Sequence, residues 1–239
     1  MIKINENYLK LEASYLFSDI AKRVAAFQKA HPGKEVIKLG IGDVTRPLPA
    51  ACIQAFHKAV DDMAQAATFR GYGPEQGYGP LIDHIRHKLA RDEGLAIERP
   101  QIMITGGSAQ AIDHLCTLFT RPGDLVLVEA PTYHETLQLF RDHGLRPLQV
   151  ATDDGGLQVE ALAARLEALA RRGERARLLY VIPNFQNPSG ITLAGDRRRA
   201  VLDLAERYDL LIVEDDVYRD LAYGSEVPPS LFALDGGRR

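Results

Sequence analysis

An acid and a phenol follow a short apolar run near the carboxyl end of this 239-residue chain. The run Leu210–Val213, which is typical of a buried strand, is followed by Asp215 and then by Tyr218. In open α/β sheets, ligands bind at the carboxyl ends of the strands. A carboxylate about 4 Å from a protonated ring nitrogen stabilises it by about 4 kcal/mol at an effective dielectric constant of about 20. Asp215 could therefore hold a pyridine ring protonated at neutral pH.

Two further predicted strand ends carry groups that suit the same ligand. Asn187 begins the turn Asn-Pro-Ser-Gly and offers an amide N–H donor, although Asn-Pro is also an ordinary turn sequence. Tyr133 comes shortly after the apolar run Leu125–Val128 and could stack on a planar ligand. An aromatic residue in that place more often serves packing, so Tyr133 is a weak indication by itself.

A glycine-rich junction supplies a candidate anion site. Residues 105–110, Thr-Gly-Gly-Ser-Ala-Gln, join a predicted strand to a predicted helix, and Ser108 could cap that helix. Free N–H groups and the positive end of the helix dipole favour a phosphate there. From spacing alone, a plain turn with a serine cap explains the segment slightly better. Taken with the three strand ends, it describes a pocket for a phosphorylated, hydroxylated pyridine.

Strands and helices alternate from Gln101 onward, which predicts an α/β fold with a mostly parallel sheet. Three helices are expected before that point, at Phe17–Lys29, Leu48–Met63 and Leu81–Glu93. The expected strands are Ile102–Thr105, Leu125–Val128, Pro147–Val150, Leu178–Ile182 and Leu210–Val213, and the helices between them are Ala109–Phe119, Tyr133–His143, Val159–Arg171 and Ala194–Tyr208.

Composition argues against several classes of partner. A formal net charge of −3 provides no electrostatic basis for binding nucleic acid or an anionic membrane. The charged run Asp196–Arg199 is interpreted as the solvated start of a helix. The N-terminus lacks an apolar signal core and no apolar run approaches membrane-spanning length, so we expect a cytoplasmic protein. Asp83, His84 and His87 have metal-like spacing, but a solvated helix face explains them better, and no metal is predicted.

The chain resembles the fold-type I, pyridoxal-phosphate-dependent aminotransferases of class I and II over essentially all 239 residues. The first third looks most like the LL-diaminopimelate branch, and the part after about Gly94 looks more like the 2-aminoadipate and aromatic branch. A natural mosaic, an unusual subfamily and a fusion all remain open. The first likeness rests on the segments Asn7–Leu11, Gly40–Pro49 and Phe69–Tyr78, and the second on Gly107–Ala111, Glu129–Tyr133, Asn184–Gly190 and Glu214–Arg219.

The resemblance implies a three-layer αβα fold with a mostly parallel sheet. Residues 1–45 would form an arm and part of a smaller domain, and residues 46–239 the cofactor-binding large domain without its final strands. It also implies pyridoxal 5′-phosphate as cofactor, with amino-group transfer between an amino acid and a 2-oxo acid such as 2-oxoglutarate. LL-diaminopimelate, an intermediate of lysine biosynthesis, is one candidate substrate.

The resemblance assigns a role to each candidate side chain. Ser108 and Ala109 would bind the cofactor phosphate, Tyr133 would stack on the ring, and Asp215 would pair with the pyridine nitrogen. Tyr218 and Asn187 would hydrogen-bond the phenolic oxygen. Tyr72 would reach the cofactor phosphate of a neighbouring subunit, which implies a homodimer, and Tyr15 and Gly42 would line the substrate carboxylate side.

The sequence lacks the group that would carry out catalysis in this family. No lysine follows Lys88, whereas the resemblance places the Schiff-base lysine shortly after the point where this chain stops. We therefore expect a weak cofactor binder with negligible transamination. The alternative is a catalytically silent binding or regulatory module, like the aminotransferase-like domain of certain transcription regulators. Those carry a winged-helix segment upstream, for which residues 1–30 leave no room.

Overall fold

A computed structural model describes residues 16–37, 46–224 and 226–237 of the chain. The described residues divide into two compact units, one made of residues 16–37 and 46–75 and the other beginning at Gln76. The division predicted from the sequence, between residues 45 and 46, stays a prediction because residues 38–45 lie outside the described part.

The first unit contains two helices, α1 (Leu16–Ala30) and α2 (Ala50–Met63). Both were expected at nearly these bounds, and both are amphipathic. Within α2 no residue is buried, and Phe56 is 60% and Val60 69% exposed. The apolar stripe of α2 therefore covers nothing within its own unit.

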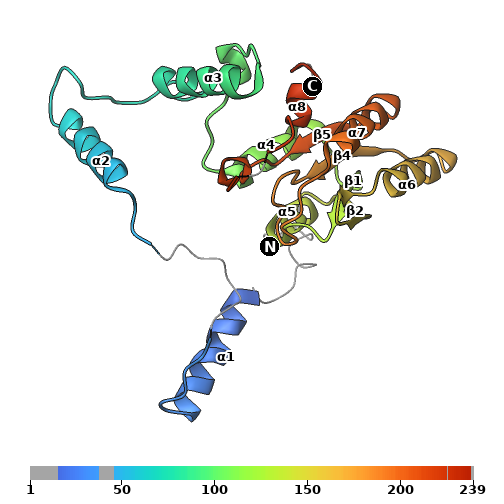
Figure 1. The fold of residues 1–239 in the computed structure, drawn as a ribbon, viewed down its shortest axis with the longest axis horizontal. Coiled ribbons are helices and arrows are strands. Elements are labelled where there is room, and N and C mark those ends of the chain that lie inside the picture. The colour runs from blue at the N-terminus through green and yellow to red at the C-terminus, as the bar shows by residue number, and fades with distance from the viewer. Residues whose placement is uncertain (1–15, 38–45, 225, 238–239) are drawn as a thin grey trace, which may run out of the picture. The chain divides into compact units, whose positions relative to one another are not determined.

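The second unit is built on a five-stranded sheet in the order β3-β2-β1-β4-β5. Strand β1 pairs in parallel with both β2 and β4, and β4 pairs in parallel with β5. Only the short β3 runs antiparallel, against the end of β2. Figure 1 shows the four longer strands side by side. Their bounds are Leu125–Ala130 for β1, Arg146–Asp153 for β2, Gly156–Leu157 for β3, Ala176–Val181 for β4 and Leu211–Glu214 for β5.

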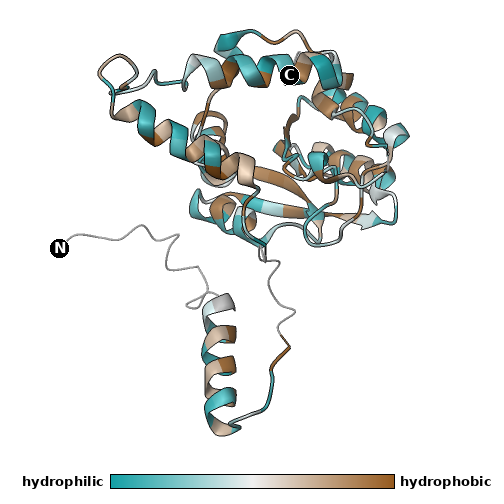
Figure 2. Ribbon diagram, turned by 60° about the vertical axis from the view of Figure 1, so that its left-hand side comes forward, coloured by the Kyte–Doolittle hydropathy of each residue, from teal (hydrophilic) through white to brown (hydrophobic). Residues whose placement is uncertain are grey.

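Helices cover both faces of this sheet. Because alternate side chains of a strand point to opposite faces, Val126 and Val128 of β1 contribute to one buried cluster and Leu125 and Leu127 to the other. The central strands are mostly brown in Figure 2, whereas the helices carry both colours. The predicted three-layer αβα architecture is confirmed. Helices α4 (Ser108–Phe119) and α5 (His134–Asp142) pack on the first face, and α6 (Val159–Arg171), α7 (Gly195–Arg207) and α8 (Leu231–Leu234) on the second.

One expected strand is absent. Residues 102–105 are extended, but they pair with no strand among the residues that the structure describes. Single hydrogen bonds hold this segment in place of a ladder: the Ile104 N–H donates to the Gln76 carbonyl oxygen at 2.8 Å, and the Ile102 N–H donates to that of Arg99 at 3.1 Å. An apolar extended run becomes a strand only when a neighbouring backbone accepts and donates its hydrogen bonds. The segment follows α3 (Gly79–Glu93) and the short 3₁₀ helix η2 (Arg99–Gln101).

The charged start of α7 differs from the solvated face expected of it. Arg198 is completely buried, and its guanidinium donates to the carbonyl oxygens of Leu193 and Pro183 at 3.0 and 3.1 Å and to Asn184 Oδ1 at 2.6 Å. It also donates to the carbonyl oxygen of Pro229 at 3.1 Å. A buried arginine is tolerated because its five N–H donors all find acceptors. Arg198 thus ties three stretches of backbone to α7.

We expect Arg198→Ala to lower the free energy of unfolding by about 3–5 kcal/mol, because it leaves a group of buried acceptors without their donor. The matched control is Arg199→Ala, which removes an exposed arginine from the next position of the same helix. It should change stability by no more than about 0.5 kcal/mol. Urea denaturation of both variants measures the difference, and equal losses would contradict the structural role of Arg198.

Candidate functional site at the carboxyl edge of the sheet

Parallel pairing brings the residues after β1, β4 and β5 to one edge of the sheet. Asp215 follows β5 directly, and its backbone N–H donates to the carbonyl oxygen of Val181 at 2.9 Å, which extends the β4–β5 ladder. The turn with Asn187 follows β4, and Tyr133 follows β1. Helix α4 precedes β1 in the chain and packs on one face of the sheet. It therefore runs antiparallel to β1, and its first residues lie at the same edge as the carboxyl ends of the strands.

A chain of hydrogen bonds ends on Asp215. The Tyr180 hydroxyl of β4 donates to Asp215 Oδ2 at 2.6 Å, and the Thr136 hydroxyl of α5 donates to the Tyr180 oxygen at 3.3 Å. Burial, and then the adjacent Asp215 carboxylate, raise the pKa of the Tyr180 phenol, so it stays a neutral donor. The sequence analysis identified Asp215 but missed Tyr180 and Thr136. The sequence pointed to Tyr180 only through its phenol, which is the one polar group in the apolar run 178–182.

Asn187 and Tyr218 lie together. The Asn187 amide nitrogen is 3.4 Å from the Tyr218 hydroxyl oxygen, to which it donates a long hydrogen bond. Both side chains are half-buried. The structure thus brings together the two residues to which the family resemblance assigned one shared acceptor. Their role toward a ligand stays a prediction.

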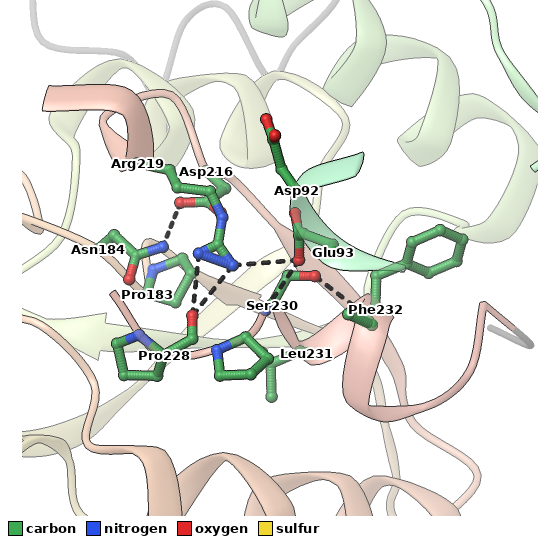
Figure 3. Close-up of polar contacts among 12 residues, drawn as sticks. Asp92, Glu93, Pro183, Asn184, Asp216, Arg219, Pro228, Ser230, Leu231 and Phe232 are labelled. Carbon is green, nitrogen blue, oxygen red and sulfur yellow. Dashed lines mark hydrogen bonds and ion pairs between the residues drawn. The ribbon is translucent and has the colours of Figure 1, made fainter. Parts of the chain in front are cut away.

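The segment that carries Tyr218 is held by a second polar network (Figure 3). Arg219 pairs with Asp216 through Nε, 3.2 Å from Oδ2, and with Glu93 of α3 through Nη2, 3.1 Å from Oε2. Its guanidinium also donates to the carbonyl oxygen of Pro228 at 2.9 Å. Asn184 donates to Asp216 Oδ1 at 2.5 Å. These bonds fasten the chain after β5, including the short helix η3 (Arg219–Leu221), to α3 and to the end of β4.

The start of α4 differs in one respect from the expectation. Gly107, with φ of 97°, is the cap residue, and Ser108 is the first helical residue and makes no capping bond. The expected Ser108 cap is therefore wrong, because glycine adopts this left-handed conformation without steric cost. Gln110 Oε1 accepts the Gly106 N–H at 2.6 Å. Ser108 and Ala109 are exposed at the helix start, and their binding of a phosphate stays a prediction.

The four remaining candidate residues come from different parts of the chain. Tyr133 precedes α5, packs against the α4–α5 face and donates to the Glu135 carboxylate. Tyr72 belongs to the first unit and is fully exposed. Tyr15 and Gly42 lie outside the described residues. The roles expected of these four residues stay predictions.

Glu129 is a buried acid that the sequence analysis did not single out. It lies in β1, is 2% exposed, and accepts the Ile182 backbone N–H at 2.9 Å. Burial raises the pKa of its carboxyl group from 4.5 to about 7. A carboxyl group at the end of four consecutive aliphatic residues was the signal in the sequence.

The part of the chain that the structure describes has neither a cluster of metal ligands nor a helix suited to a membrane. No group of three or more His, Cys, Asp or Glu side chains there is arranged to hold a metal ion. None of the helices described is both long and apolar enough to span a membrane.

Comparisons with known proteins agree with this geometry. The family model described as "Aminotransferase class I and II" matches residues 34–237. The LL-diaminopimelate aminotransferase of Desulfotalea psychrophila is 38% identical over 243 residues, which cover 99% of this chain and 58% of that protein. A second one, from Bacteroides fragilis, is 34% identical over 100% of this chain and 58% of its own length. The chain thus spans 58% of the length of these curated relatives.

Solved structures of related proteins share the fold. The kynurenine aminotransferase of Pyrococcus horikoshii, solved in complex with PMP, is 34% identical with a TM-score of 0.80, over 97% of this chain and 55% of that one. LysN, an alpha-aminoadipate aminotransferase from Thermus thermophilus complexed with N-(5′-phosphopyridoxyl)-L-leucine, is also 34% identical, with a TM-score of 0.66 over 77% of this chain and 44% of that one.

The buried carboxyl group generates a pH-dependent prediction. In the unfolded chain Glu129 ionises near pH 4.5, whereas the fold keeps it protonated to about pH 7. Its contribution to stability is therefore complete below about pH 4.5 and is lost as the pH rises through 7. Glu129→Gln keeps an acceptor for Ile182 and cannot ionise. It should match the parent at pH 4.5 and be more stable by up to about 3 kcal/mol at pH 8.

Urea denaturation at the two pH values measures this difference. The exposed Glu167→Gln on α6 is the matched control and should show no such pH-dependent gain. A Glu129→Gln variant that is no more stable than the parent at pH 8 would refute the assignment.

Proposed function

The chain belongs to the class I and II aminotransferase family, and from that membership we propose that it binds pyridoxal phosphate at the carboxyl edge of its sheet. In the whole protein this site would serve amino-group transfer between an amino acid and a 2-oxo acid. The observation that carries the proposal is the placement of Asp215 at the end of β5, held by Tyr180, with the Asn187–Tyr218 pair on neighbouring segments.

The donors and acceptors at this edge fit the cofactor group by group. A protonated pyridine nitrogen needs an anionic acceptor, and Asp215 retains Oδ1 for it while Oδ2 accepts from Tyr180. A phenolic oxygen needs donors. The Asn187 amide and the Tyr218 hydroxyl group can supply them, and the nitrogen and oxygen atoms of these two groups lie 3.4 Å apart. A phosphate needs backbone N–H groups and a positive field, which the start of α4 offers at Ser108 and Ala109.

When bound, pyridoxal phosphate supplies the electron sink that amino-group transfer requires. Asp215 would keep the proton on the ring nitrogen, and Tyr218 with Asn187 would fix the ring's rotation within its plane. Tyr133 would cover one face of the ring and exclude water from it. The attraction between Asp215 and a protonated ring nitrogen would contribute about 4 kcal/mol at a separation of about 4 Å and an effective dielectric constant of about 20.

Lys88 does not replace the missing lysine. It lies on α3, where its Nζ is 3.0 Å from Asp220 Oδ1 and 3.3 Å from Asp92 Oδ2. The hydrogen bond with Asp220 raises the pKa of its ammonium group, whereas a nucleophilic lysine needs the pKa lowered. Because Lys88 is held in these ion pairs, a silent cofactor-binding module is the second candidate function for the residues of this chain.

The substrate of the whole protein is proposed from its relatives. LL-diaminopimelate aminotransferases are 34–38% identical over the whole chain in several bacteria, which supports LL-diaminopimelate as amino donor and a role in lysine biosynthesis. 2-Oxoglutarate would be the acceptor. The 2-aminoadipate branch is represented among the structural relatives and remains the alternative specificity. A cytoplasmic homodimer, with Tyr72 reaching the neighbouring cofactor, completes the proposal.

Cofactor binding can be measured directly. We expect the chain to bind pyridoxal phosphate, and Asp215→Ala to weaken binding about 100-fold, equivalent to about 2.8 kcal/mol. Equilibrium dialysis or titration of the cofactor's absorbance gives the dissociation constants. Asp203→Ala, which removes an exposed acid from α7, is the control and should bind like the parent. Equal affinity of the parent and the Asp215→Ala variant would exclude this site.

Transamination by the chain itself should be negligible. A positioned acid–base group typically raises the reaction rate by about 10²–10⁴-fold, and the residues of this chain after Lys88 include no lysine. The assay measures glutamate formed from 2-oxoglutarate with LL-diaminopimelate or 2-aminoadipate as donor. The rate should equal that of the Asp215→Ala variant and of free pyridoxal phosphate. Turnover at rates ordinary for enzymes would show that the chain contains a catalytic base we have not recognised.

A further inference from the structure

We propose that Tyr180 is a positioning residue for Asp215, which orients the carboxylate and selects which of its oxygens is left for the ring nitrogen. The inference rests on the proposed function, because it concerns how Asp215 meets pyridoxal phosphate. It assigns a role to a hydroxyl group that would not itself touch the cofactor.

Packing fixes the place of the Tyr180 ring. The residue is completely buried on the α4–α5 face of β4, among Val128, Phe140 and Ile182. The Phe140 ring meets it edge-on, with centroids 5.8 Å apart and an interplanar angle of 79°. A buried ring held in this way has no alternative rotamer of similar energy. Its hydroxyl group is therefore a rigid point in the sheet from which Asp215 is oriented.

The direction of the hydrogen bonds is set by the partners of that hydroxyl. Thr136 Oγ1 donates to the Tyr180 oxygen at 3.3 Å, and the Tyr180 proton is directed to Asp215 Oδ2 at 2.6 Å. A carboxylate can only accept, so the chain runs from Thr136 through Tyr180 to Asp215. Burial raises the pKa of the phenol, so the proton stays on Tyr180.

Two consequences for Asp215 follow from this arrangement. Oδ2 is engaged, so Oδ1 is the oxygen left to face a ligand beyond the strand end. A carboxylate held in place by that bond would meet the ring nitrogen at hydrogen-bonding distance, and its charge would favour the protonated form of the ring. Tyr180 thus supports the ionic state on which the use of the cofactor depends.

Tyr180→Phe tests the inference, because it removes the hydroxyl group and keeps the packed ring. Asp215 then lacks the hydrogen bond that orients it, so we expect pyridoxal phosphate to bind about tenfold more weakly, equivalent to about 1.4 kcal/mol. In the Asp215→Ala background the same substitution should have no further effect, because the bond has lost its acceptor. Tyr208→Phe, which removes a hydroxyl group at the end of α7, is the matched control and should bind like the parent.

A second readout separates positioning from a general structural role. A pyridoxal phosphate analogue with carbon in place of the ring nitrogen should bind the parent and Tyr180→Phe equally well. With ¹⁵N-labelled cofactor, the nitrogen resonance should show a protonated ring at pH 7.5 in the parent and a ring that loses its proton at lower pH in the variant. A merely structural defect would weaken both ligands alike and would not move the titration.

The outcomes distinguish the inference from the function on which it rests. If the parent does not bind pyridoxal phosphate, both fall. If the parent binds and Asp215→Ala weakens binding, but Tyr180→Phe leaves affinity and titration unchanged, only the inference is overturned. Equal losses for the cofactor and its carbon analogue would also overturn it. Thr136→Val is the alternative test if Tyr180→Phe does not fold. It should weaken pyridoxal phosphate binding about threefold and shift the titration of the ring nitrogen in the direction expected for Tyr180→Phe.

Discussion

Parallel pairing of β1, β4 and β5 is the constraint on which the site depends. Strands that run the same way end at the same edge, so the residues after each strand meet there although as many as 85 positions separate them in the sequence, from Ala130 to Asp215. The pairing is stable because both faces of the strands are covered, by α4 and α5 on one side and by α6 and α7 on the other. A sheet open on one face would have needed polar side chains at the positions of Val126 or of Leu179, which now pack on opposite faces.

Buried polar groups give this apolar framework its specificity. Arg198 gathers backbone carbonyls from three segments, Glu129 accepts a backbone N–H between β1 and β4, and Glu214 accepts those of Leu231 and Phe232 at the start of α8. Each is expensive to bury without a partner and nearly neutral with one. They therefore select one arrangement of the loops at the carboxyl edge, and Tyr180 extends the same principle to the orientation of Asp215.

The longer elements of the second unit could mostly be predicted from the sequence, because apolar periodicity marks them, whereas the short β3 and α8 were not predicted. The helix expected at Val159–Arg171 has these bounds in the structure, and β1 and β5 begin within one residue of their predicted starts. The expected strand at Ile102–Thr105 failed, because its partner is not encoded in its own residues. The Ser108 cap failed for a local reason, since Gly107 takes the left-handed conformation that ends the loop.

The sequence by itself determined the family and the chemistry of the candidate groups, because an acid, an amide and a phenol have the same donors and acceptors wherever they lie. It also determined which strand ends carry them. Only the tertiary structure decided which groups meet: Tyr180 reaches Asp215 across two neighbouring strands, and Asn187 reaches Tyr218 across 31 positions of sequence. Register between strands and the direction of buried side chains arise from packing on both faces, and no single segment contains that information.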